Sequence, residues 1–370
     1  MMTGSFLFLN LIPQFNKFIS TTLTKRVSLE LSFMKRILVT GGTSFITQHI
    51  IKQLLTDTTH EITTTIRAHS NRTNILKTWL TMYPKRLIIV QNDLDNVESL
   101  KPIVNGKFAV IHVASPFVMS NTTSREEMVN PALGMTKTVL HACQATSVQK
   151  VIFTSSSVTM SQIICKDPID ENMFNSANKL SPYEASKVES EKYIWEFVKE
   201  NNPSFKVVSI HPSAVIGPGF SEHVVSSSVK SFVIDILNGK SLPFKTQLDI
   251  LMVDVRDVAK AHILAIEKGE GRYLCCAESV PISEIVTTGT SLYNLPNAPF
   301  VHVPSILVQG LALFMDENTS SFLKGHVGRG HYKFDNSKIQ QDLGLKFMDI
   351  KTSLKETIVW CHESKLLLNK

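Results

Sequence analysis

Tyr183 and Lys187 stand four residues apart and form the most readily interpreted chemical pair in the sequence. A phenol with an unperturbed pKa of about 10 is a poor acid–base catalyst near neutral pH unless a neighbouring cation favours its anion. The lysine ammonium would supply that charge. The chain has six tyrosines, and only this one has a lysine four positions later. The spacing still arises readily by chance in 370 residues, so it needs support from its surroundings.

A complete helix-start signal surrounds this pair. Ser181 can cap a helix, Pro182 suits its first position, and Glu184 completes a capping box. Tyr183 and Lys187 would then lie one turn apart on the same helix face.

Three consecutive hydroxyl side chains, Ser155, Ser156 and Ser157, end another predicted strand. The carboxyl edge of a parallel sheet is where α/β folds bind ligands, so one hydroxyl would lie close to a bound molecule. A polar turn is the simpler interpretation of three serines at a strand end, and both interpretations stay open at this point.

A glycine-poor turn follows the first predicted strand, in the sequence TGGTSFITQHI at 40–50. Dinucleotide-binding folds place three glycines here, for the tight turn, the approach of the pyrophosphate and close helix packing. Gly41 keeps the first position, but Ser44 and Thr47 occupy the other two. The Ser44 hydroxyl could still donate a hydrogen bond to a phosphate. An ordinary turn before an amphipathic helix is the alternative.

A basic residue ends the second predicted strand. Arg67 stands there, Arg72 lies nearby, and no acidic residue occurs before Asp93. A carboxylate at this position would bind the ribose of NAD, whereas an arginine would accommodate the 2′-phosphate of NADP. The charge therefore favours NADP, with an ordinary surface arginine as the alternative.

Short apolar runs, which predict strands, alternate along the chain with helical patterns. This strand–helix–strand order predicts right-handed crossovers and a parallel sheet that positions these residues. We expect an α/β fold: a Rossmann-type doubly wound parallel sheet of six or seven strands with a smaller C-terminal substrate lobe. The expected strands are 36–40, 61–67, 86–90, 108–114, 150–156 and 205–212, and the expected helices are 45–55, 73–82, 125–145 and 182–200.

The predicted organisation has three parts. Residues 1–33 form an N-terminal extension, 34–216 an NADP-binding domain, and 217–370 a substrate-binding lobe with segments that return to the Rossmann core. The extension is rich in Ser and Thr and nearly free of acids, a composition typical of a mitochondrial transit peptide. The simpler interpretation is a disordered tail, or an upstream start codon before a natural start at Met34. We therefore expect a cytoplasmic protein, with mitochondria as the alternative location.

Charge and cysteine content exclude several classes of protein. The net charge of +6 is mild and no long basic run occurs, which argues against nucleic-acid binding. No apolar stretch is long enough to span a membrane. The five cysteines show no C-x-x-C pair and no metal-ligand spacing, so we expect reduced, mostly buried thiols and no metal.

Taken together, the chain resembles the extended short-chain dehydrogenases/reductases, in the branch of dihydroflavonol reductases and fungal NADPH-dependent carbonyl (methylglyoxal) reductases. The resemblance covers residues 34 to about 360, and its ASPF segment is more similar to the fungal enzymes than to the plant ones. It rests on LVTGGTSFITQHI, VIHVASPF, NPALGMTKTVLHAC, VIFTSSS, YEASK, HPSAVIGP, VDVRDVAKAH and KFDNSKIQQDLGLKF.

The resemblance implies a catalytic set of Ser156, Tyr183 and Lys187. Ser156 is chosen over its neighbours because the family's serine follows the aromatic strand residue, here Phe153, by three positions. Besides Tyr183 and Lys187, the implied NADP(H)-binding residues are Gly41, Ser44, Phe45 and Ile46 at the pyrophosphate, Arg67 at the 2′-phosphate, Asp93 and Leu94 beside the adenine, Ala114 near the ribose, and Pro212 and Val215 beside the nicotinamide.

The implied function is NADPH-dependent reduction of a small ketone or aldehyde by a monomer or homodimer. Tyr183 would donate the proton, Ser156 would orient the carbonyl, and Lys187 would lower the pKa of Tyr183 and hold the ribose. One alternative is a degenerate nucleotide-binding protein, because two motif glycines are replaced. The other is an NAD-dependent sugar-nucleotide epimerase or dehydratase, against which Arg67 argues.

Overall fold

The computed structural model describes residues 34–68, 70, 72–115, 124–160, 168–176, 180–240, 245–299, 301–314, 327–328 and 331–368. The predicted N-terminal extension, 1–33, lies outside these residues. No helix among the described residues is long and apolar enough to cross a membrane.

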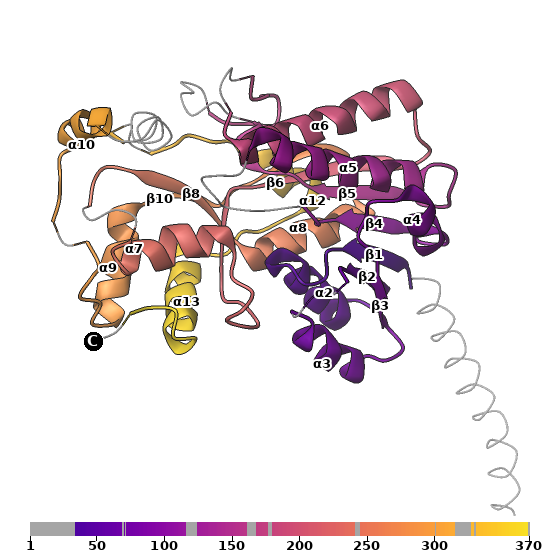
Figure 1. Cartoon of the computed structure of the whole chain (residues 1–370), viewed down its shortest axis with the longest axis horizontal. Coiled ribbons are helices and arrows are strands. Elements are labelled where there is room, and N and C mark those ends of the chain that lie inside the picture. The colour runs from indigo at the N-terminus through magenta and orange to yellow at the C-terminus, as the bar shows by residue number, and fades with distance from the viewer. Residues whose placement is uncertain are drawn as a thin grey trace, which may run out of the picture.

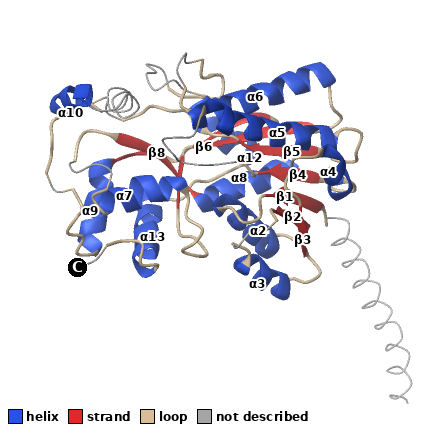
Figure 2. Ribbon diagram, in the orientation of Figure 1, coloured by secondary structure: helices blue, strands red, loops and turns tan. Residues whose placement is uncertain are grey.

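A seven-stranded sheet is the larger of two sheets, and all its strand pairs are parallel (Figures 1 and 2). The direction in which the sheet grows reverses between β1 and β4, the first and fourth strands along the chain. Open α/β sheets bind ligands at the carboxyl ends of such a pair. In sheet order the strands are β3 (Leu87–Gln91), β2 (Glu61–Ile66), β1 (Arg36–Thr40), β4 (Ala109–His112), β5 (Lys150–Thr154), β6 (Lys206–Pro212) and β9 (Gly271–Cys275).

Helices cover both faces of this sheet, as Figure 1 shows. Alternate residues of β1 enter different cores, since Ile37 and Val39 pack on one side and Leu38 on the other. The first face is covered by α2 (Phe45–Asp57), α3 (Asn74–Met82), α8 (Val255–Glu267) and α12 (Ser337–Leu343), and the second by α4 (Val97–Val104), α5 (Arg125–Cys143) and α6 (Pro182–Asn201).

A three-stranded sheet forms the smaller layer, with β8 parallel to β7 and antiparallel to β10. Its helices enclose a separate apolar core. The elements are β7 (Ala214–Ile216), β8 (Asp249–Asp254), β10 (Glu278–Pro281), the π-helical η2 (Val229–Ile234), α7 (Asp235–Leu237), α9 (Ile282–Leu292), α10 (Ser305–Leu311), the 3₁₀ turn η3 (Ala312–Phe314) and α13 (Ile350–Glu363).

The predicted fold class is confirmed. Every strand and helix predicted between residues 36 and 212 is present, although α4 was not predicted. The seventh strand, β9, comes from the region assigned to the C-terminal lobe. It pairs with β6, and α12 packs beside it, so this part of the chain returns to the main sheet.

Candidate active site

The start of α6 fixes the positions of the tyrosine and the lysine. The capping box is formed: the Glu184 amide donates to the Ser181 hydroxyl at 3.3 Å, and the Ser181 amide donates to a Glu184 carboxylate oxygen at 2.8 Å. Tyr183 and Lys187 are both partly buried in the first turns of this helix. Local sequence therefore sets where both side chains leave the backbone.

Ser156, Tyr183 and Lys187 meet at the carboxyl end of β5. Ser156 begins the short 3₁₀ turn η1 (Ser157–Thr159), and its side chain forms a hydrogen bond with the Tyr183 phenol. Lys187 Nζ donates to the Thr154 carbonyl oxygen at 3.4 Å. Tertiary structure thus brings together the three side chains that the resemblance implied.

Ser155, the residue before Ser156, has different hydrogen-bond partners. The Ser155 amide donates to the Ile210 carbonyl at 2.8 Å, which ties the end of β5 to β6. The buried Ser155 hydroxyl has no hydrogen-bond partner among the described residues. Of the residues Ser155 and Ser156, it is therefore Ser156 whose hydroxyl pairs with the phenol.

The expected lowering of the Tyr183 pKa by Lys187 is not what the structure shows. Burial raises the pKa of the phenol, and the hydrogen bond with Ser156 only partly offsets this rise. Burial also lowers the pKa of Lys187 to about 8. Tyr183 is therefore protonated at neutral pH, which is the state that a proton donor needs.

Two glycines are required by the geometry of the turn after β1. Gly41 has φ +75°, and a Cβ on it would lie 3.0 Å from the Ala114 Cα at the end of β4. A Cβ on Gly42 would lie 2.5 Å from the Thr64 hydroxyl oxygen. The backbones at the ends of β1 and β4 therefore approach closely at the point where the strand order reverses.

The two replaced glycines stand where side chains are accommodated. Ser44 has φ −85° and ψ 157°, an ordinary extended conformation, and it caps α2 by accepting from the Thr47 amide at 3.3 Å. The buried Thr47 hydroxyl lies 3.4 Å from the Thr40 carbonyl, to which it donates, and 2.7 Å from the Ser44 hydroxyl. The Ser44 and Thr47 hydroxyls therefore pair with each other, and either of them can be the donor.

Backbone groups at the same helix start fit an anionic ligand. The amides of Phe45 and Ile46 are in the first turn of α2, where no helix carbonyl can pair with them. Within the described ranges, no other acceptor is found for either amide. Since helix N-termini attract anions, this turn suits the pyrophosphate of a dinucleotide even with Ser44 in place.

The residues expected at the adenine end lie side by side. Arg67 is exposed directly after β2, and the Asp93 carboxylate accepts from the next amide, that of Ala68, at 3.3 Å. Leu94 is buried with φ +61°, and its amide donates to the Asn92 side chain at 2.9 Å. The end of β2 thus carries an exposed guanidinium, and the end of β3 carries an ordered turn.

The remaining predicted residues lie at the ends of β4 and β6 and in β7 of the smaller sheet. The Ala114 amide donates to the Thr40 hydroxyl oxygen at 3.3 Å, beside the turn after β1. Pro212 ends β6, and Val215 is buried in β7. Phe117, the last residue of the ASPF segment, lies outside the described residues.

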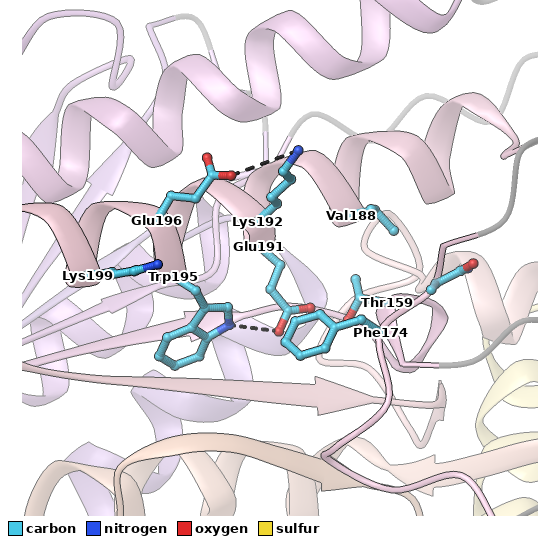
Figure 3. A pocket seen from close by; sticks show the side chains of 9 residues that line it. Thr159, Phe174, Val188, Glu191, Lys192, Trp195, Glu196 and Lys199 are labelled. Atoms are coloured by element: carbon cyan, nitrogen blue, oxygen red, sulfur yellow. Dashed lines mark hydrogen bonds and ion pairs between the residues drawn. The ribbon is translucent and has the colours of Figure 1, made fainter.

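Sequence reasoning missed a buried group of titratable side chains behind Ser156: Glu191, His211 and Arg272. Figure 3 shows Glu191 beside a groove of about 330 Å³ on α6, with the Trp195 indole donating to its carboxylate at 3.1 Å. One signal was available, because Glu191 continues the four-residue spacing of Tyr183 and Lys187 along one side of the helix.

Comparisons with known proteins agree with this geometry. The sequence model described as "NAD dependent epimerase/dehydratase family" matches residues 37–276. Cinnamoyl-CoA reductase 1 of Petunia hybrida is 32% identical over 337 residues, which cover 87% of this chain and 90% of that protein. A putative NADPH-dependent methylglyoxal reductase of Candida albicans is 28% identical over 349 residues, 87% of this chain and 97% of that protein. Plant and fungal relatives match at similar identity, so the comparison does not favour the fungal branch.

One solved structure illustrates the shared fold. The yeast methylglyoxal/isovaleraldehyde reductase complexed with NADPH superposes with a TM-score of 0.72 at 22% identity. The match covers 90% of this chain and 100% of that one. At this identity the likeness establishes the fold.

Proposed function

The chain belongs to the NAD dependent epimerase/dehydratase family, and from that premise we propose that it is an NADPH-dependent reductase of a small ketone or aldehyde. The observation that carries the proposal is the hydrogen bond between Ser156 and Tyr183, with the Lys187 ammonium held at the neighbouring Thr154 carbonyl. The names of the relatives, reductases from plants and fungi, support the same reaction class.

When bound, NADPH supplies the hydride that reduces the carbonyl carbon of the substrate. Tyr183 donates its phenolic proton to the oxygen on which negative charge develops. Ser156 donates a hydrogen bond to the same oxygen and holds it in line with Tyr183. Lys187, whose ammonium donates to the Thr154 carbonyl, would hold the ribose of the cofactor.

The cofactor assignment rests on two regions of this chain. The free amides of Phe45 and Ile46 would bind the pyrophosphate, as helix N-termini bind other anions. The exposed Arg67 would bind the 2′-phosphate that distinguishes NADPH from NADH. Ser44 caps the helix without occupying either amide, which supports a working cofactor site over a degenerate one.

The decisive variant is Tyr183→Phe, which removes the proton donor and keeps the ring. Turnover should fall by about 10²–10⁴-fold, the range typical of a lost general acid, while a fluorescence titration should show NADPH binding close to wild type. Activity is measured as NADPH oxidation with a panel of small carbonyls that includes methylglyoxal and isovaleraldehyde.

Tyr193→Phe is the matched control, because Tyr193 lies on the same helix but pairs with His141 at 3.1 Å. That variant should keep wild-type turnover. Wild-type reduction by Tyr183→Phe would overturn the proposed role. Stoichiometric NAD copurifying with the protein would instead favour the epimerase or dehydratase alternative.

A further inference from the structure

Glu191, His211 and Arg272 form a support cluster that is almost completely shielded from solvent, with 2%, 0% and 8% exposure. They come from α6, β6 and β9, respectively. Arg272 Nε donates to Glu191 Oε1 at 2.6 Å, and His211 Nε2 lies 3.3 Å from the same oxygen. Buried charges are costly unless they are paired, so this arrangement calls for a reason beyond packing.

The outer end of the support cluster is rigidly held. Arg272 Nη1 donates to the carbonyls of Glu171 and Met173, each at 2.6 Å, and its guanidinium lies 3.8 Å from the Phe174 ring centroid. Burial by itself would raise the pKa of Glu191, but His211, Arg272 and hydrogen bonds to the carboxylate outweigh it and lower that pKa. Glu191 therefore stays charged at neutral pH.

The inner end of the support cluster reaches the backbone of Ser156. His211 Nδ1 lies 3.2 Å from the Ser156 carbonyl oxygen and 3.0 Å from Thr159 Oγ1. Thr159 donates its own hydroxyl proton to that carbonyl at 3.0 Å, so it can accept one from His211. Burial lowers the pKa of His211 to about 4. Because the Ser156 carbonyl can only accept, the Nδ1 contact is a hydrogen bond in the tautomer that carries the ring proton on Nδ1.

The other ring nitrogen agrees with this tautomer. Ser209 Oγ lies 2.7 Å from His211 Nε2 and can donate its proton there, closer than the Glu191 oxygen. In this tautomer Nδ1–H donates to the Ser156 carbonyl oxygen and to Thr159 Oγ1.

We propose that His211, held in place by Glu191 and Arg272, is a positioning residue that fixes the Ser156 carbonyl and thereby aims the Ser156 hydroxyl at Tyr183. The proposal rests on the proposed function. Ser156 is the second residue after the end of β5, and three donors converge on its carbonyl: the Thr159 amide at 3.1 Å, the Thr159 hydroxyl and the His211 ring. Removing one of them loosens the backbone from which the hydroxyl extends.

Two substitutions of His211 separate positioning from packing. His211→Leu keeps an apolar volume and removes the donor, whereas His211→Asn places an amide nitrogen at about the distance of Nδ1 from the backbone. His211→Leu should lower kcat about tenfold, the rate equivalent of one hydrogen bond of about 1.4 kcal/mol. His211→Asn should stay within about threefold of wild type, and neither should change the NADPH dissociation constant in the fluorescence titration.

Thr159→Val provides a second route if His211→Leu does not fold, because it removes the linking hydroxyl and keeps the shape. It should lower kcat severalfold. His141→Leu is the control, since His141 pairs with Gln144 and Tyr193 outside the support cluster. That control should leave kcat unchanged.

A double-mutant cycle gives the decisive result. If His211 acts through the Ser156 hydroxyl, Ser156→Ala/His211→Leu should turn over no more slowly than Ser156→Ala alone. Losses that multiply, or a folded His211→Leu with wild-type kcat, would overturn the proposal. Wild-type turnover by Ser156→Ala alone would instead overturn the role of Ser156 in the proposed function.

Discussion

The turn after β1 and the turn after β5 lie at the same edge of the sheet but present different kinds of chemical group. After β1, the groups suited to binding are backbone amides, and side chains can change wherever the backbone conformation is ordinary. After β5, the groups proposed to act are side chains, and a buried set of titratable residues lies behind them. A site built from backbone therefore tolerates substitutions that a site built from side chains does not.

The glycine positions after β1 make this contrast concrete. Gly41 needs its φ of +75° and a bare Cα against Ala114, whereas Ser44 has φ −85° and serves as a helix cap. A motif counted by glycines marks both positions as equally important. The physical requirement applies to Gly41 and not to Ser44.

Of the substitutions that test this contrast, Gly41→Ala should have the largest effect on stability and on NADPH affinity. A Cβ there meets the backbone of Ala114 at 3.0 Å, in a conformation that costs L residues about 1–2 kcal/mol. Thermal unfolding should show a loss of at least about this size, and NADPH affinity should fall with it. Gly134→Ala is the control, since a Cβ at Gly134 meets nothing within 4 Å in the middle of α5. It should stabilise the protein by about 0.5–1 kcal/mol. Equal effects of the two variants would contradict the contrast.

A smaller effect is expected at the adenine end. Arg67→Ser should weaken NADPH binding about tenfold through loss of one exposed charge-assisted contact. NADH lacks the 2′-phosphate, so its binding should hardly change and serves as the internal control. Equal weakening for both cofactors would show that Arg67 does not select NADPH. Parallel fluorescence titrations measure both.

The smallest effect should come from Ser44→Gly, which restores the glycine of the family pattern. Replacing a serine cap by glycine costs only a few tenths of a kcal/mol, on the order of 0.3. NADPH affinity should change by less than about threefold, because the amides of Phe45 and Ile46 stay where they are. Binding at least about tenfold tighter than wild type would show that Ser44 obstructs the cofactor, and the tolerance argued for this turn would then be wrong.

Much of the fold followed from local patterns. Apolar runs predicted the strands from β1 to β6, and Ser181 with Glu184 predicted the start of α6. β9 was missed because its five residues, GRYLC, alternate weakly and lie in a region of irregular periodicity. Its pairing with β6 depends on a crossover of the chain and not on its own sequence.

The pKa of Tyr183 shows a second limit of local reasoning. The four-residue spacing placed Tyr183 and Lys187 on one helix, as the structure has them, but it could not show that burial would dominate the pKa of the phenol. Burial depends on how α6 packs against the sheet, so the direction of the shift came only from the folded chain.

By itself the sequence determined the fold class, the start of α6 and the strand ends that carry the candidate site, because these depend on short-range capping, periodicity and turn chemistry. The family resemblance already pointed to Ser156, whereas tertiary structure alone decided that Glu191, His211 and Arg272 converge behind it. These residues lie on α6, β6 and β9, and the register that places Ser209 opposite Arg272 joins two of those elements. Such contacts depend on the packing of distant segments, and the helical spacing of Glu191 shows which helix face it occupies but not which strands pack against it.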